Sequence, residues 1–446
     1  MEKSSSKSAV DLCEFGLSQI VRFRADGMQH INASIEADPD YCLPIIIKAC
    51  MLQGANDARF DREVANLIEQ GYQRLPSGQH YESGLLKAVA AANAGRGFEA
   101  ATLYEQLLLD SPDNLFLHLL AQEQTFWLGK PQWMRNLIEA AAPVWTEVHT
   151  DFGPFLSLRA FANEEAGYSN EAEYYGRAAV ELDSSDVWGA HAVAHVLDMK
   201  GEYGKGIDWL EGLSVNWTHA NQMRHHLWWH ICLFLFETGD YDRILSLLNT
   251  QIRNLDSPLV KASPSATIDI NNYSSILIRL ELYGVDVSSH WQTLQPVCSE
   301  RVTNHGSAFS NIHDMFVLSG AGDVLQANAL FESMLQHFSA PNQVGSVAEV
   351  YHTVGIPVCE AILAFRKKDY NRVLLKLGGI RHHLQMMGAS HAQRDVFFHL
   401  LVYAAEQVQR NDLRALYLKD IESLGFHNVE TRAAYKGAQS RKRVSQ

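Results

Sequence analysis

Proline is scarce in this chain, with 12 residues in 446. That is roughly half the usual share of proline in proteins. Proline inside a helix removes a hydrogen bond and clashes with the preceding turn, at a cost of about 3 kcal/mol or more. The shortage therefore favours a mostly helical chain. A content of 47% hydrophobic and 20% charged residues is that of a globular protein, not of a disordered one.

Positive charge is also in short supply. Lys and Arg number 37 against 51 Asp and Glu, which gives a formal net charge of −14. Nucleic-acid phosphates demand clustered Lys and Arg, so we expect no nucleic-acid partner. The one basic cluster is the tail "SRKRVSQ", with Arg441, Lys442 and Arg443. We interpret it as a solvated chain end.

Paired cysteines and long apolar runs are missing as well. None of the six cysteines forms a C-x-x-C pair, so neither a disulfide framework nor a thiolate zinc site is expected. The N-terminus "MEKSSSKSAVDLCEFG" lacks the apolar centre of a signal peptide. Uninterrupted apolar runs fall far short of the ~20 residues that span a bilayer. We therefore expect a soluble, cytoplasmic protein with no membrane partner.

What the chain does contain is a repeat of short polar turns after apolar stretches. The turns are "AGRGFEAA", "LGKPQWMR", "AGYSNEAE", "KGEYGKGI" and "TGDYDRIL". Aligned on Phe98, Gln132, Tyr168, Tyr203 and Tyr241, they are 34, 36, 35 and 38 residues apart. Less regular members follow at "AGDVLQAN" and "KKDYNRVL", which align on Val324 and Tyr370. The period is close to that of the tetratricopeptide unit, a helix–turn–helix of 34 residues.

The segment "FEAATLYEQLLLDSPDN" fits this unit best. Small Ala100 lets two helices approach, Tyr104 fills the space beside it, and Pro112 ends the second helix. Later units are degenerate, and Gly206 stands in the small position of one of them. Each helix pair leaves an apolar face that only its neighbour can bury. The sequence therefore predicts an all-α fold, a right-handed α-solenoid of degenerate tetratricopeptide-like helix pairs.

The spacing of the turns along the sequence divides the chain into five predicted segments. They are an N-terminal helical cap (1–75), regular repeats (76–250), an irregular insertion with a helix (251–315), degenerate repeats (316–430) and a basic flexible tail (431–446). Within the insertion, "SPLVKASPSATIDINNYSS" is predicted to be a loop, followed by the helix "SSILIRLELYG". Asp269 is interpreted as the N-terminal cap of that helix or as a residue that faces the groove.

Histidines recur at matched places before the turns. Counting back from each turn places His191, His195, His226, His230 and His313 on the first helix of a pair. In such a solenoid the first helices line the concave surface. The spacing of four residues within "HAVAH" and "HLWWH" stacks each histidine pair on one helical face.

Three interpretations of these histidines stay open. They are buried and hydrogen-bonded structural residues, or ligands of a metal, or part of a metal-free pocket that also uses Trp229. For the metal, the candidate ligands are His191, His195, His226 and His230. "HAVAH" lacks the general-base Glu of a metalloprotease helix, and no repeated E-x-x-H motif suggests di-iron.

A second polar group stands in "SHAQRDVF". Gln393, Arg394 and Asp395 lie between Gly388 and the predicted helix "VFFHLLVYAA". One interpretation is a capped helix start with a surface ion pair. The other is a binding site for a carboxylate or phosphate, because Arg and Gln at a helix N-terminus suit both.

Four segments carry a family resemblance. "HAVAHVLDMKG", "HHLWWHICLFLFETGDYDRIL", "SSILIRLELYGVDVSSHW" and "SHAQRDVF" resemble, in this order, the signature segments of the tetratricopeptide repeat protein 38 family, also called StaR-like. The resemblance extends over nearly the whole chain. It implies functional roles for His191, His195, His226, Trp229, His230 and the Gln393–Arg394–Asp395 run, and for Asp269, His305 and His313 at less secure matches.

The resemblance implies a helical-repeat fold without an established activity. One branch of the family, encoded with glycopeptide-antibiotic genes, is associated with a suggested flavin-dependent hydroxylation of a tyrosine side chain. This chain has no G-x-G-x-x-G after a strand pattern, so no flavin or other organic cofactor is expected. We expect a binding protein for a small acidic or aromatic ligand or a peptide segment. A metal-dependent enzyme, possibly of hydroxylase type, and a pure interaction scaffold remain the alternatives.

Overall fold

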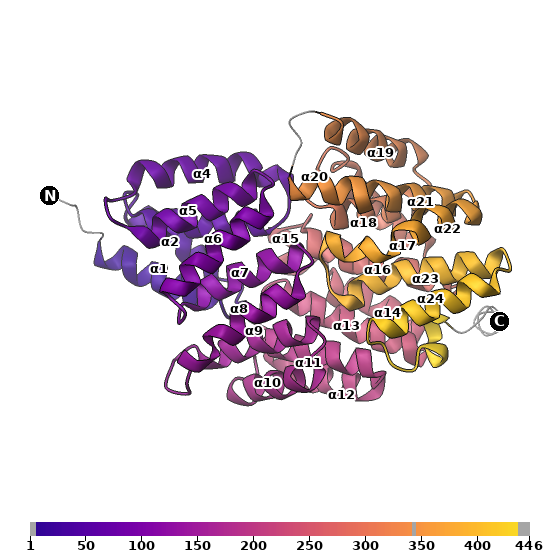
Figure 1. The fold of residues 1–446 in the computed structure, drawn as a ribbon, viewed down its shortest axis with the longest axis horizontal. Coiled ribbons are helices and arrows are strands. Elements are labelled where there is room, and N and C mark those ends of the chain that lie inside the picture. Colours follow the sequence, from indigo (N-terminus) through magenta and orange to yellow (C-terminus); the bar gives the residue numbers. More distant parts are fainter. Residues whose placement is uncertain (1–5, 341–344, 436–446) are drawn as a thin grey trace. The chain divides into compact units, whose positions relative to one another are not determined.

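The computed structural model describes residues 6–340 and 345–435. Over these residues the chain is helical and forms no strand, apart from one isolated bridge between Arg24 and Ala220 (Figure 1). The predicted all-α class is confirmed. Arg441, Lys442 and Arg443 of the predicted tail lie outside the described residues.

The chain divides into two compact units. The first comprises residues 1–193, 215–223 and 344–347, and the second comprises 194–214, 224–343 and 348–446. The helices of the first unit are α1 (Lys7–Ile20), α2 (Gly27–Ala37), α3 (Cys42–Gly54), α4 (Asp61–Arg74), α5 (His80–Asn93), α6 (Gly97–Asp110), α7 (Leu115–Trp127), α8 (Pro131–Ala141), α9 (Phe152–Glu165) and α10 (Ser169–Leu182).

Three helices cross a division between the units: α11 (Val187–Lys200), α13 (Met223–Thr238), which belongs to the second unit from Arg224 on, and α20 (Ser346–Val350). The second unit also contains α12 (Tyr203–Leu213), α14 (Tyr241–Leu247), α15 (Pro258–Ala262), α16 (Thr267–Leu282), α17 (Ser288–Ser299), α18 (Ala308–Gly320), α19 (Val324–Phe338), α21 (Ile356–Arg366), α22 (Tyr370–Ile380), α23 (His391–Gln407) and α24 (Asn411–Ser423). Single 3₁₀ turns, a seven-residue 3₁₀ helix at Arg381–Met387 and two π turns, at Leu248–Ile252 and Tyr351–Gly355, join some of them.

Every turn in the predicted series separates the two helices of a hairpin. The alignment residues lie at the start of α6, α8, α10, α12, α14, α19 and α22, within two residues of the first helical position. Gly95, Gly129, Gly167, Gly201, Gly239 and Gly322 precede the first six of these starts, and all have positive φ, while Lys368 takes this conformation before α22. Glycine adopts that conformation without steric cost, which is why it recurs there. The succession of helical hairpins is confirmed, while the solenoid arrangement and the tetratricopeptide identity stay predictions.

First helices of the hairpins are buried almost all round. In α9 every residue from Ala160 to Glu165 is buried, and in α16 every residue from Asp269 to Leu280. The partner helices are amphipathic, and α10 buries only four residues. A helix surrounded by neighbours can present side chains in every direction to the protein interior. The first helices are therefore the elements that can carry buried polar side chains on more than one face.

The predicted loop "SPLVKASPSATIDINNYSS" is wrong over most of its length. Residues Pro258–Ala262 form α15, and α16 begins at Thr267, before the predicted helix start. Asn and Ser favour turns because their side chains compete for backbone hydrogen bonds. Here Asn272 and Ser275 bond to side chains of α13 instead, so the helix continues through them. Gly284, with φ 92°, then ends the first helix of a hairpin that the sequence analysis did not identify.

One continuous helical stretch among the described residues, Ser346–Arg366, is long and apolar enough to cross a membrane by length and composition. Half of its apolar window is buried inside the protein. Its last part, α21, packs on α18 and α22. A core helix of a soluble protein passes the same test, and this packing is that of a core helix.

Candidate functional site

The predicted histidines lie on the first helices of their hairpins, as expected. His191 and His195 are on α11, His226 and His230 are on α13, and His313 is on α18. All five are buried. This placement on first helices, derived from the turn spacing alone, is confirmed.

Three of these histidines meet in the second unit. The ring centroids of His195 and His230 are 4.6 Å apart, and those of His226 and His230 are 4.9 Å apart. One ring nitrogen of each histidine lies within 4.8 Å of one ring nitrogen of each of the others. We call His195, His226 and His230 the imidazole cluster. Its members are 1, 5 and 0% exposed, so it is a feature of the interior and not of the surface.

Helix α16 fixes the orientation of one ring of the cluster. His226 Nδ1 lies 2.8 Å from the amide oxygen Oδ1 of Asn272. Since that oxygen only accepts, Nδ1 carries the proton and donates it, and the lone pair of the neutral ring is on Nε2. Trp229 stacks on the same imidazole with ring centroids 4.8 Å apart and 12° between the planes. Asn272 therefore fixes one edge of the His226 ring, and Trp229 covers one of its faces.

A chain of hydrogen bonds leads from Trp229 to the start of α23. Trp229 Nε1 donates to Ser275 Oγ, at 3.3 Å. Arg279, one turn further along α16, donates to the Ser275 carbonyl oxygen at 3.0 Å and to the carbonyl oxygen of Ala392 at 2.9 Å. The Arg279 side chain is fully buried. It links the helix that supports the imidazole cluster to the helix that carries Arg394.

Asp269 has a definite role that differs from a helix cap. The N-cap position of α16 is Ala266, and Asp269 instead accepts a hydrogen bond from His225 Nδ1 at 2.8 Å. Both side chains are buried, so they form an interior pair between α13 and α16. His225 was not singled out from the sequence, although it is the first histidine of "HHLWWH".

His191 belongs to the first unit, one helical turn before His195 on α11. Its ring packs against Phe161 and Trp188, at centroid distances of 5.3 and 4.9 Å. These contacts are those of a histidine in an aromatic core. A ligand role for His191 stays a prediction.

His305 and His313 have partners of their own. His305 contacts Asn311 Oδ1 at 2.9 Å through Nδ1 and Ser333 Oγ at 2.8 Å through Nε2. His313 Nδ1 donates to the carbonyl oxygen of Phe309, at 2.8 Å. Burial lowers the pKa of His313 to about 4, and the charges of Arg279 and Arg301 add to that effect against the Phe309 hydrogen bond. His313 is therefore neutral at physiological pH.

The start of α23 is capped, as one interpretation of "SHAQRDVF" predicted. Ser390 and Gln393 form a reciprocal capping box, so Gln393 serves the helix end. Asp395 is buried and pairs with His399 Nε2 at 2.7 Å, and it also accepts from the hydroxyl of Tyr435. Burial opposes its ionisation, but the His399 charge and hydrogen bond, with Arg279 and Arg432, lower the pKa of Asp395 to about 2. The interpretation of a surface ion pair is therefore wrong for Asp395, which is buried and whose partner is a histidine of its own helix.

Residues 431–435, the first five of the predicted tail, take part in this packing. Arg432 and Tyr435 are buried. Arg432 forms an ion pair with Asp198 of α11, with 3.5 Å between Nη1 and Oδ1. The main-chain nitrogen of Ala433 donates to Glu237 of α13, at 2.6 Å. The end of the described chain thus holds α11, α13 and α23 of the second unit together.

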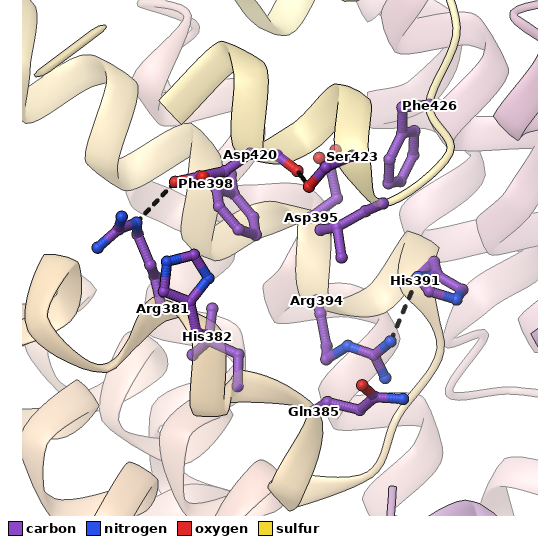
Figure 2. Close-up of a pocket in the computed structure, with 12 residues that line it drawn as sticks. Arg381, His382, Gln385, His391, Arg394, Asp395, Phe398, Asp420, Ser423 and Phe426 are labelled. Carbon is purple, nitrogen blue, oxygen red and sulfur yellow. Dashed lines mark hydrogen bonds and ion pairs between the residues drawn. The ribbon is translucent and has the colours of Figure 1, made fainter. Parts of the chain in front are cut away.

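Arg394 borders a polar cavity of about 100 Å³ (Figure 2). Its guanidinium donates to the carbonyl oxygens of Gly388 and Ala389 and lies 3.4 Å from His391 Nδ1. Gln385 lies next to it in Figure 2. We call this cavity the Arg394 pocket; it is lined by Arg381, His382, Leu384, Gln385, His391, Arg394, Asp395, Phe398, Asp420, Ser423, Leu424 and Phe426.

Charges around the Arg394 pocket are arranged so that its carboxylates already have cationic or donor partners. Asp420 accepts from Arg381 Nε at 2.6 Å, and Asp395 pairs with His399. Arg394, His391 and Gln385 contribute N–H groups on one side (Figure 2). Phe398 and Phe426 add apolar walls. Such a pocket suits a small anion.

Sequence reasoning missed several of the residues that complete these sites. Asn272, Ser275 and Arg279 lie in or just beyond the segment predicted to be a loop, so their helical spacing was not used. Had α16 been identified from residue 267 on, the spacing 272–275–279 would have placed the three on one face. His391 and Gln385 carried no pattern that distinguishes them from surface residues. No protein-family model matches the chain.

Proposed function

We propose that this protein is a helical-repeat binding protein that captures a small anionic ligand, a carboxylate or phosphate, in the Arg394 pocket. The observation that carries the proposal is the buried guanidinium of Arg394 beside His391 and Gln385 at a cavity of about 100 Å³. A guanidinium donates two parallel hydrogen bonds to a carboxylate or phosphate, and such charge-assisted bonds are the strong ones.

The size of the pocket narrows the ligand class. Pockets for drug-sized molecules have volumes of roughly 300–1,000 Å³. A cavity of about 100 Å³ encloses only a short acid, or the acidic end of a longer ligand or peptide segment. We therefore propose that the acidic group enters the pocket while any aromatic or peptide portion remains outside it.

The wider proposal follows the family resemblance. We propose a tetratricopeptide repeat protein 38-like protein of the cytoplasm, with a small-molecule or peptide partner and without nucleic-acid or membrane partners. The net charge of −14 supports the absence of a nucleic-acid partner. The alternative function, a metal-dependent enzyme, requires a bound metal ion. The imidazole cluster is the feature that supports such an ion.

Titration calorimetry with acetate, succinate and inorganic phosphate at constant ionic strength tests the pocket. Arg394→Lys keeps the positive charge but loses the planar fork, so we expect affinity to fall about 10- to 100-fold, as loss of a charge-assisted hydrogen bond implies. Arg372→Lys, an exposed arginine of α22 that pairs with Glu360, is the matched control and should change nothing.

His391→Ala and Gln385→Ala provide a second comparison in case Arg394→Lys disturbs the turn at Gly388. Neither side chain is fully buried, so the fold should tolerate both changes. Each change removes an N–H donor from the pocket. It should therefore lower the affinity for whichever tested anion binds the wild-type protein most tightly. Equal binding by wild type and all three pocket variants would reject the proposal and leave the scaffold alternative.

A further inference from the structure

The imidazole cluster calls for an explanation that packing does not supply. His195, His226 and His230 are all at least 95% buried and are arranged ring against ring. Polar side chains are costly to bury, and apolar residues of similar size would fill the same volume at lower cost. Three imidazoles in mutual contact in the interior therefore point to a task that needs their nitrogen atoms.

Helix geometry brings the ring nitrogens to one place. His226 and His230 are four residues apart and so project from the same face of α13. His195 joins them from the part of α11 that belongs to the same compact unit. The candidate nitrogens lie within 4.8 Å of one another. A tetrahedral zinc ion with Zn–N distances of ~2.0–2.1 Å holds nitrogens roughly 3.4 Å apart. Side-chain rotations that move each ring by about an ångström would close this difference.

The surroundings of His226 match those of a metal ligand. Ligand histidines usually donate their second ring N–H to an oxygen, which fixes the tautomer and the ring orientation. Asn272 Oδ1, itself on a buried side chain, performs this role at 2.8 Å from Nδ1. Trp229 holds the face of the ring.

We propose that His195, His226 and His230 bind one divalent first-row transition-metal ion, with zinc as the reference ion. Imidazole nitrogens select zinc and its neighbours, whereas magnesium and calcium prefer oxygen ligands. Asn272 is a positioning residue that acts through His226. This site is separate from the Arg394 pocket and does not depend on the anion proposal.

The full-length protein, treated with EDTA and dialysed, serves for the test. Zinc affinity and stoichiometry are measured by competition with a chromogenic chelator, and Co²⁺ absorption reports the coordination number. We expect one zinc per chain and intense Co²⁺ d–d bands of a four-coordinate ion. His195→Gln and His226→Gln should each lower the zinc affinity at least about 100-fold, because only two imidazoles remain.

Asn272→Ala separates a positioning role from a ligand role. Loss of such an outer partner lowers metal affinity by about 10- to 100-fold while the ligands remain. We therefore expect weaker zinc binding with unchanged stoichiometry and Co²⁺ bands. His305→Ala, which removes another buried and hydrogen-bonded histidine of the same unit, is the matched control and should leave zinc affinity as in wild type.

Circular dichroism of each zinc-free variant shows whether it folds. If a glutamine variant fails to fold, Asn272→Ala still carries the test, since it leaves all three imidazoles in place. Less than about 0.2 zinc per chain for wild type would overturn the proposal. Equal zinc affinity of wild type, the folded cluster variants and Asn272→Ala would also overturn it, because zinc would then bind at other histidines.

Discussion

At the scale of single residues, environment decides what each histidine does. His313 and His226 are both fully buried, and burial lowers the pKa of both rings. His226 is fixed by a side-chain amide from another helix, while His313 donates to its own helix through Phe309. Within the described residues, His313 Nε2 has no hydrogen-bond partner. A proton on that nitrogen would therefore be a buried N–H without an acceptor.

His313 makes the stability of the protein depend on pH. The folded pKa of about 4 lies below the unfolded value of 6.5. Its contribution to stability is therefore fully present above pH 6.5 and is lost as pH falls toward 4. The difference corresponds to roughly 3 kcal/mol. We expect His313→Gln to flatten the loss of unfolding free energy between pH 6.5 and 4, measured by urea titration at each pH.

The exposed His383 supplies the comparison for this titration. His383→Gln should leave the pH dependence of unfolding unchanged, because the His383 side chain is exposed and folding does not remove it from water. If His313→Gln and wild type lost the same free energy over this pH interval, the buried neutral state of His313 would be refuted.

At the scale of helices, the hairpin is the recurring element, and small residues set the distance between neighbours. Gly206 of α12 occupies the small position predicted from the repeat, and a Cβ there would meet the ring of Phe234 of α13 at 2.5 Å. Ala100 of α6 is the equivalent residue in the best-fitting unit, and it is fully buried. Gly206 therefore meets, in its own hairpin, the same requirement for a small side chain as Ala100.

Gly206→Ala should destabilise the second unit. The added methyl group forces the Phe234 ring or the α12 backbone to move, and such overpacking costs about 1–3 kcal/mol. Gly204, two residues earlier on α12, has open space around its Cβ position. Gly204→Ala should be neutral or stabilise the helix by up to about 1 kcal/mol. Thermal unfolding of both variants measures the contrast, and equal melting temperatures would contradict it.

At the scale of the whole molecule, the functional candidates gather in one part of the chain. The imidazole cluster, the His225–Asp269 pair and the Arg394 pocket all belong to the second unit. Arg279 connects the first and the last of them through Ser275 and Ala392. The first unit has a large apolar core, which includes Ile46, Leu86 and Leu117. The proposed anion and the proposed metal ion, if bound there, would therefore stabilise the second unit in particular.

Hydrogen exchange tests this division. A ligand that binds only the native state stabilises the part of the structure that forms its site. Zinc should therefore slow amide exchange in α13 and α16, and leave α3 and α5 of the first unit unchanged. The His226→Gln variant in the same zinc concentration is the control and should show no slowing. Equal slowing in both units would show that they unfold together.

The sequence by itself determined the class of fold, the positions of the seven turns in the predicted series and the helices that carry the histidines. These are local properties, because glycine conformations and apolar periodicity act over a few residues. The conformation of residues 257–275 could not be predicted from the local sequence, because contacts with α13 stabilise the start of α16.

Only the tertiary structure decided which polar residues meet. Asn272 reaches His226 across 46 residues, Tyr435 reaches Asp395 across 40, and Arg279 reaches Ala392 across 113. Such contacts depend on how whole helices rotate and pack, and helical periodicity predicts a face but not its neighbour. Two histidines four residues apart are consistent with packing in the hydrophobic core or with binding of a ligand. The neighbouring residue that distinguishes these two roles comes from another helix.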